Sequence, residues 1–165
     1  MTIDPAAAAY GIFQVVFAEM TENLAGALFR FRQVKQPELT FKQVFRMVFN
    51  KLLKEFEDDL KPASEPSALS DSLSAVRDAC AAMKSIADWR NDRIHARVRQ
   101  GDGGLALYNW RTGEPLPITY EECENQITQA IKVIVILEAH VPSLVGSLNM
   151  PDLIKQLLQT PDPLD

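Results

Sequence analysis

Residues 69–95 read LSDSLSAVRDACAAMKSIADWRNDRIH, and this segment sets the architecture expected of the chain. Its apolar residues recur every three or four positions, which is typical of an amphipathic helix with one buried face. These residues are Leu69, Leu73, Val76, Cys80, Met83 and Ala87. The same face continues into Arg90, where a guanidinium is costly unless it meets an anion or lines a polar cleft. The segment therefore predicts a long helix that carries an arginine inward near its end.

A first helix is expected upstream of this segment, over residues 5–33. Asp4 and Pro5 form a typical helix start, with an N-cap residue followed by proline at the first helical position. The apolar stripe of this helix comprises Phe13, Phe17, Met20, Leu24, Leu28 and Phe31, and it is widened near its start by Ile12, Val15 and Val16. A stripe this wide is expected to be buried against more than one neighbour.

A second helix is predicted to start at Thr40. The pattern Thr40-Phe-Lys-Gln43 is a capping box, in which the hydroxyl and the amide satisfy free backbone donors reciprocally. The helix is expected to continue to about residue 56 and to present Phe41, Val44, Phe45, Val48, Phe49, Leu52, Leu53 and Phe56 inward. The segment 61–67 is rich in proline and serine, and we interpret it as a connection between helices.

The character of the chain changes after residue 99. The glycine-rich segment 100–104 predicts a turn, and residues 105–118 predict a short hairpin-like flap. The capping box Thr119-Tyr-Glu-Glu122 opens a further helix to about residue 139, which Pro142 is expected to end. Its expected core residues are Ile127, Ile131, Ile134, Val135 and Leu137. A short C-terminal helix is predicted to start at Pro151, followed by a frayed tail at 160–165.

These elements together predict an all-α fold. Four long helices with short connections favour an antiparallel up-and-down four-helix bundle, here with a short hairpin-like flap and a short C-terminal helix. A chain of 165 residues is expected to form a single domain over residues 1–165 and to bury one sizeable core.

Composition and charge restrict the cellular setting. No apolar run reaches 18 residues and the start lacks the basic region of a secretory signal, so neither a membrane nor secretion is expected. Cys80 and Cys123 are isolated from other metal-ligand residues, which favours reduced thiols in a cytoplasmic protein. The net charge of −5 argues against indiscriminate coating of nucleic acid. Residues 90–99 nevertheless contain four arginines against one aspartate.

The spacing of reactive side chains in Arg90-Asn91-Asp-Arg-Ile-His95 suggests chemistry. It resembles the Arg-x4–6-His signature of the HEPN superfamily, whose members typically carry Asn, Asp or His directly after the arginine. The resemblance covers this hexapeptide and, more broadly, the expected all-helical architecture. It implies a HEPN-like helical domain that acts as a homodimer and cleaves RNA as an endoribonuclease of the toxin or defence kind, without a metal or other cofactor. An antitoxin protein is a further partner that the resemblance implies.

The residue types fit the reaction that this resemblance implies, in which the RNA 2′-hydroxyl attacks the adjacent phosphate. An imidazole exchanges protons near neutral pH, so His95 fits as proton acceptor or donor. The planar fork of Arg90 can hold two phosphate oxygens where negative charge develops. Asn91 is expected to orient the substrate or His95. Arg93 and Arg97 are expected to bind the flanking phosphates.

Helix geometry adds a condition to this assignment. On a continuous helix the side chains at positions 90 and 95 lie about 140° apart, because each residue turns the helix by about 100°. One copy of the pair therefore does not converge on one phosphate. Convergence requires a local break in the helix or a second copy of the motif, and the resemblance implies the second copy.

Three alternatives remain open from the sequence. The first alternative is a catalytically inactive HEPN-like module that binds RNA or a protein. The second is a helical adaptor without any nucleic-acid role, in which His95 is a solvated residue near a helix end. A third reading uses Asp88, Asp92 and His95, which share a helical face and offer two carboxylates and an imidazole to a divalent metal ion.

Overall fold

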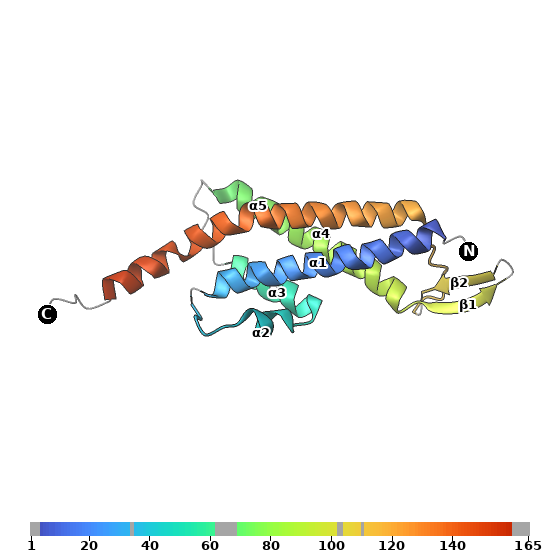
Figure 1. The fold of residues 1–165 in the computed structure, drawn as a ribbon, viewed down its shortest axis with the longest axis horizontal. Coiled ribbons are helices and arrows are strands. Elements are labelled where there is room, and N and C mark those ends of the chain that lie inside the picture. Colours follow the sequence, from blue (N-terminus) through green and yellow to red (C-terminus); the bar gives the residue numbers. More distant parts are fainter. Residues whose placement is uncertain (1–3, 34, 62–68, 102–103, 110, 160–165) are drawn as a thin grey trace. The chain divides into compact units, whose positions relative to one another are not determined.

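A computed structural model describes residues 4–33, 35–61, 69–101, 104–109 and 111–159 of the chain. This part is mostly helical, as the sequence predicts (Figure 1). The elements in chain order are α1 (Pro5–Gln33), α2 (Phe41–Phe45), α3 (Phe49–Leu60), α4 (Ser70–Ile94), β1 (Arg97–Gly101), β2 (Gly104–Tyr108) and α5 (Tyr120–Gln159). The predicted frayed tail at 160–165 lies outside the described residues.

Contacts gather into two compact units. The first comprises Met1–Met20 and Ala81–Val133, and the second comprises Thr21–Cys80 and Ile134–Asp165. The helices α1, α4 and α5 each contribute one segment to each of the two units. The motif Arg90–His95 belongs to the first unit.

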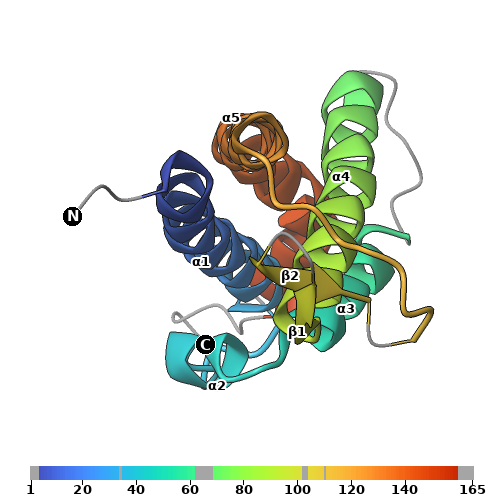
Figure 2. The same cartoon turned by 90° about the vertical axis from the view of Figure 1, so that its right-hand side faces the viewer.

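The core of the first unit forms where segments of α1, α4 and α5 lie side by side (Figure 2). Trp89 of α4 packs against two aromatic rings of α1, with centroid distances of 4.9 Å to Phe13 and 6.1 Å to Tyr10. Edge-to-face aromatic pairs of this kind add to the stabilisation that area burial supplies. The buried apolar residues of this unit are Ala9, Phe13, Phe17, Met20, Met83, Ile86, Ala87, Cys123, Ala130 and Val133.

The core of the second unit joins α1 to α3 and α4 to α5. Phe31 meets Phe56 edge to face at 5.5 Å. Beside this pair, Arg32 forms ion pairs with Glu55 and Asp59 of α3. The buried apolar residues of this unit are Leu24, Ala25, Ala27, Leu28, Phe31, Val44, Leu52, Leu53, Phe56, Leu60, Leu73, Val76, Ala79, Cys80, Leu137, Val141 and Leu144.

Three helix starts confirm the sequence predictions. The Ala6 backbone N–H donates to the Asp4 carboxylate at 2.9 Å, so Asp4 caps α1. The capping box at the start of α2 is present, with the Thr40 N–H donating to the Gln43 side chain at 2.8 Å. At the start of α5 the Glu122 N–H donates to the Thr119 hydroxyl at 3.1 Å. Local side-chain chemistry therefore fixes where these helices begin.

The predicted helix over residues 41–56 is wrong in one respect. It is broken between α2 and α3, where Val48 adopts an extended conformation as the N-cap of α3. The break changes the phase of the apolar residues, so Phe41, Phe45 and Val48 are 37%, 49% and 72% exposed instead of facing inward. Val44 and Leu52 are fully buried, as expected.

Two predicted apolar faces are also only partly buried. Ile12 and Val15, expected to widen the buried stripe of α1, are 57% and 68% exposed. On α5, Ile131 and Val135 are 48% and 57% exposed. The buried side of α5 instead uses Cys123, Ala130, Val133, Leu137, Val141 and Leu144, because these positions are the ones that meet the other helices.

Pro142 does not end α5, in contrast to the prediction. The helix continues through Pro142 and Pro151 to Gln159, so no separate C-terminal helix is present among the described residues. A proline within a helix removes one backbone donor but is tolerated where the rest of the helix is held. The segment Tyr120–Ser147 of α5 is long and apolar enough to cross a membrane by length and composition, although core helices of soluble proteins meet the same criteria. Of its most apolar window, 28% is buried.

β1 and β2 form an antiparallel pair from Arg97 opposite Tyr108 to Gly101 opposite Gly104, and the predicted turn at 100–104 falls partly outside the described residues. The sequence did not predict β1. The flap over 105–118 is present as an extension of β2: Tyr108 bridges Pro115, and the Leu116 N–H donates to the Leu107 carbonyl at 2.8 Å. Gly113 allows the tight turn between Tyr108 and Pro115, with a positive φ of 75°.

Candidate functional site

The motif Arg90–His95 occupies the last turn of α4 and the first residue beyond it. The helix ends at Ile94, and the His95 N–H still donates to the Asn91 carbonyl at 3.1 Å. The turn closes with a bond from the Ala96 N–H to the Arg93 carbonyl at 3.3 Å, and β1 begins one residue later. The motif is therefore placed at a junction between a helix and a strand, within the first unit.

Arg90 points from α4 toward α1. Its Nε–H donates to the side-chain oxygen of Gln14 at 3.0 Å, and its guanidinium carbon lies 4.5 Å from the centre of the Phe17 ring. The residue is half-buried. Among the described residues no carboxylate pairs with it, and its two Nη groups make no hydrogen bond. The sequence prediction that Arg90 points inward is confirmed, and the group it meets is a neutral amide.

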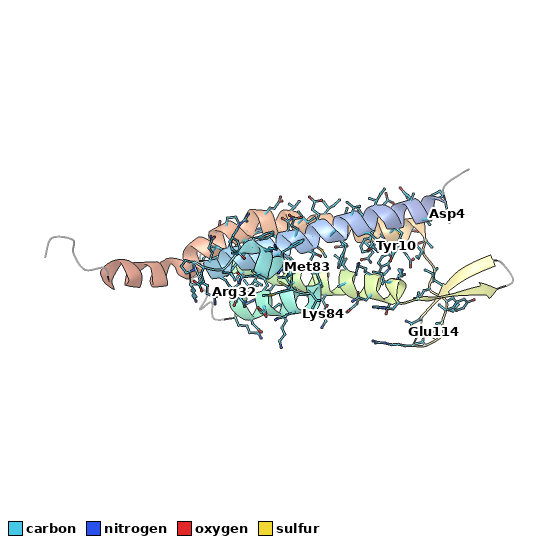
Figure 3. The ribbon with its side chains drawn as sticks, turned by 60° about the horizontal axis from the view of Figure 1, so that its bottom comes forward. Asp4, Tyr10, Arg32, Met83, Lys84 and Glu114 are labelled. Carbon is cyan, nitrogen blue, oxygen red and sulfur yellow. The ribbon has the colours of Figure 1, made fainter. Side chains whose placement is uncertain are left out.

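Tyr10 and Gln14 extend this arrangement along α1. Figure 3 shows Tyr10 between α1 and α4, where it also contacts Trp89. Burial raises the pKa of the Tyr10 phenol, while the charge of Arg90, the nearby Gln14 amide and the charge of Arg93 act in the opposite direction. Gln14 is close enough to influence that pKa, yet its buried Nε2 makes no hydrogen bond of good geometry with the described residues.

Arg93 is held by the chain itself. Its side chain is 7% exposed and lies 3.5 Å from the Glu122 carboxylate. It also donates to the carbonyls of Trp89 at 3.2 Å and Pro117 at 3.3 Å, and its guanidinium stacks 3.9 Å from the centre of the Trp89 ring. Its Nε is buried without a partner among the described residues. As placed, Arg93 fastens the segment 117–122 to α4, and the prediction that it binds a flanking phosphate gains no support from this geometry.

Among the described side chains, neither Asn91 nor His95 forms a hydrogen bond with Arg90. His95 is exposed just beyond the helix, and Asn91 is half-buried. Arg97 is the first residue of β1 and pairs through its backbone with Tyr108. One chain therefore holds Arg90 against α1 and leaves His95 open to solvent, as the helical spacing of about 100° per residue leads one to expect.

The metal alternative has no geometric support in the part of the chain that the structure describes. No group of three His, Cys, Asp or Glu side chains lies close enough there to hold a metal ion. Asp88, Asp92 and His95 are each exposed. The two cysteines are both free and buried, and burial raises the pKa of the Cys80 thiol to about 12. Such a thiol is a poor nucleophile near neutral pH.

Tyr10 and Gln14 are the residues that sequence reasoning missed. A signal was present, since Gln14 stands inside the apolar run Gly-Ile-Phe-Gln-Val-Val-Phe and four positions after Tyr10. Residues four apart share a helical face, so the two polar groups lie on the side of α1 that carries Phe13 and Phe17. A polar residue on a buried stripe requires a hydrogen-bonding partner, and here that partner is Arg90.

A cavity of about 560 Å³ adjoins Tyr10 in the first unit. It lies between the start of α1 and the segment 115–118, and its wall includes Asp4, Leu107, Pro117 and Ile118. The wall is mostly apolar.

Comparison of the chain with protein-family models, with curated proteins and with solved structures gives no match.

Proposed function

We propose that this chain is a HEPN-like endoribonuclease, in which Arg90 binds the scissile phosphate and His95 transfers protons without a metal ion. The observation that carries the proposal is the state of Arg90, a half-buried guanidinium that pairs with an amide and a ring and with no carboxylate among the described residues. A cation in such surroundings favours an anionic ligand, because an unpaired charge away from bulk water is costly. His95 follows five positions later and is exposed to a substrate.

The second part of the proposal is a homodimer, in which a second copy supplies the histidine that one chain does not bring to Arg90. Support comes from an apolar surface of the first unit. Ile12, Val15 and Ile131 are about half exposed or more, and Ile12 lines a groove with Tyr120 and Ile127. Exposed apolar clusters of this kind mark interaction surfaces. We propose that the second copy covers this apolar surface. We also propose that the protein is cytoplasmic and is not a membrane protein.

The proposal includes the finer architecture, a single domain over residues 1–165 in which α1, α3, α4 and α5 form an antiparallel four-helix bundle. It also includes the toxin or defence setting and an antitoxin partner. These predict that expression of the chain inhibits cell growth, and that His95→Ala removes the inhibition.

The test is cleavage of a labelled RNA by the purified chain in the presence of a chelator. We expect cleavage, products that end in a 2′,3′-cyclic phosphate, and no cleavage where a 2′-deoxynucleotide replaces the attacking residue. Arg90→Ala and His95→Ala are each expected to reduce the rate by about 10²-fold or more. Full cleavage by either variant would refute the assignment.

A catalytically inactive RNA-binding module is the second candidate. It is favoured by the separation of Arg90, which faces α1, from His95, which is exposed beyond α4. This candidate predicts that RNA binds and is not cut, and that Arg90→Ala weakens binding while His95→Ala does not. An RNA gel-shift assay run beside the cleavage assay separates the two candidates.

A further inference from the structure

The Arg90 guanidinium is oriented by one hydrogen bond that leaves most of its donors free for a ligand. A guanidinium has five N–H donors. The Nε–H is taken by the Gln14 side-chain oxygen at 3.0 Å, and the ring of Phe17 covers one face of the group. The two Nη groups make no hydrogen bond with the described residues. The bond to Gln14 therefore fixes the direction in which the open end of the fork points.

The polar groups around this fork can each donate a hydrogen bond to a ligand. Gln14 Nε2 is buried and has no partner among the described residues. Tyr10 stands one helical turn before Gln14 on α1, and its ring contacts Trp89, the residue before Arg90 on α4. A hydroxyl can donate a hydrogen bond, and an amide NH₂ group can only donate. Guanidinium, amide and phenol together present a set of N–H and O–H groups with no oxygen anion to receive them.

The electrostatics of this place also favour an anion. The charged groups that act on Tyr10 include two guanidinium groups, Arg90 and Arg93. Arg93 has a partner in Glu122 at 3.5 Å, whereas Arg90 has no carboxylate partner among the described residues. The Phe17 ring covers one face of the Arg90 guanidinium and excludes water there, and charge-assisted hydrogen bonds are stronger where water is excluded.

We propose that Tyr10 and Gln14 of α1 complete a phosphate-binding site around Arg90, with Gln14 as the positioning residue that aims the guanidinium. The inference rests on the proposed function in one respect, that Arg90 is the group that binds phosphate. It extends that function to a second helix. The ligand is a tetrahedral phosphate group, whose several oxygens can accept from the Nη pair, from Gln14 Nε2 and from the Tyr10 hydroxyl at once. The same chemistry fits free phosphate and an RNA phosphodiester.

The variant Gln14→Glu tests this positioning role with almost no change of shape. It sets a carboxylate at the place of the amide oxygen, 3.0 Å from Arg90 Nε, so the guanidinium gains an internal anion. Calorimetric titration of the full chain with inorganic phosphate, at constant ionic strength in chloride, measures the effect. We expect the variant to bind phosphate about tenfold more weakly or worse, with a melting temperature equal to or above that of the parent chain.

Gln129→Glu is the matched control, because Gln129 is exposed on α5 and the change adds the same charge. It should bind phosphate within about twofold of the parent chain, since surface charges act weakly through water. The proposal is overturned if the parent chain does not bind phosphate, if Gln14→Glu binds it normally, or if both variants lose affinity equally.

A second measurement keeps the test decisive if Gln14→Glu does not fold. The arginine reagent phenylglyoxal is applied to the parent chain, and modified peptides are identified by mass spectrometry. Phosphate should slow the modification of Arg90, whereas Arg32, already paired with Glu55 and Asp59, should be unaffected. Equal modification of Arg90 with and without phosphate would overturn the inference.

The same variants separate this inference from the proposed function. If the parent chain binds phosphate through Gln14 and yet cuts no RNA, the inference stands and the nuclease proposal fails. If the chain cuts RNA and Gln14→Glu does so with unchanged KM and kcat, the nuclease stands and the inference fails. Binding of a 2′-deoxy oligonucleotide, which cannot be cut by the proposed reaction, distinguishes a polynucleotide site from a site for free phosphate.

Discussion

Arg32 and Arg90 are two arginines with similar positions and opposite environments. Each leaves a helix beside a phenylalanine-rich core, and each is partly buried. Arg32 meets two carboxylates of α3, with its Nε donating to Asp59 at 2.7 Å and its Nη1 pairing with Glu55. Arg90 meets a neutral amide and a phenyl ring. The first arrangement is complete within the chain, whereas the second gains from an anion supplied from outside.

The comparison separates a structural arginine from a candidate binding arginine on physical grounds. Hydrogen bonds that Arg32 donates to Asp59 and Glu55 raise its pKa, although partial burial acts in the opposite direction, so Arg32 stays charged at any ordinary pH. No such carboxylate holds Arg90 among the described residues. An arginine in a helix near an aromatic core can therefore have either a structural or a binding role, and the group that it pairs with distinguishes the two.

The largest effect is expected from removal of the incomplete arginine. Arg90→Ala should lower RNA cleavage by about 10²- to 10³-fold, because the cation that meets the developing charge is lost. Its melting temperature should fall only moderately, because the Gln14 amide oxygen loses its donor and the contact with the Phe17 ring is lost. Cleavage rates and thermal unfolding of the same preparation provide the measurement. A large loss of stability with unchanged cleavage would reverse the comparison.

Removal of the complete arginine should have the opposite profile. Arg32→Met keeps much of the side-chain volume but removes the cation that Glu55 and Asp59 share, which leaves only the longer contact of Lys51 with Glu55 at 3.7 Å. We expect the free energy of unfolding to fall by about 1–2 kcal/mol, because the three side chains are only partly exposed. Denaturant unfolding gives this value, and RNA cleavage should match the parent chain under native conditions. Arg30→Met, an exposed position on the same helix, is the control.

A smaller effect should follow from giving Arg32 the amide partners that are typical of Arg90. The double variant Glu55→Gln with Asp59→Asn leaves Arg32 facing amides, as Arg90 faces Gln14. We expect a loss of about 1 kcal/mol in the free energy of unfolding. Modification of Arg32 by phenylglyoxal should become faster. If the modification rate of Arg32 does not change, partner chemistry does not control how available these arginines are.

The smallest effect at neutral pH concerns the thiol of the second unit. Burial raises the pKa of Cys80 to about 12, so the group is neutral in the folded chain where an unfolded thiol ionises. The corresponding stability is full below the ordinary thiol pKa and is lost as pH rises toward about 12. Unfolding measured from pH 8 to 11 should show a decline, and Cys80→Ala should make it shallower without removing it, because burial also raises the pKa of Cys123 and Tyr10. Alkylation of Cys80 should be slow until the chain unfolds, and rapid labelling of the native chain at pH 8 would contradict this account.

Much of the helical framework could be predicted because its signals are local. Asp4, Thr40 and Thr119 announce helix starts through bonds to nearby backbone or side-chain groups. The stripe of α4 is regular enough to place Arg90 on the inward side. These features depend on spacing along one helix, which the sequence contains in full.

The features that escaped prediction depend on contacts between distant segments. The break before α3 contains neither glycine nor proline, so nothing local announces it. The environment of Arg90 depends on Gln14, 76 positions away. Arg93 could be read as a phosphate ligand from the motif alone, because the sequence does not show that Glu122 and Pro117 reach it. A motif identifies reactive residues, whereas the fold decides which of them stay accessible.

The passage of α5 through Pro142 has a consequence for how this helix opens. Proline has no N–H, so the carbonyl of Glu138 receives no bond from position 142 and the ladder of α5 is interrupted there. Amide protons near the gap lose the support of a full helical turn, and deuterium should enter this stretch before it enters the segment around Ala130. The 40-residue helix is then expected to open first at such gaps, and not as one cooperative unit.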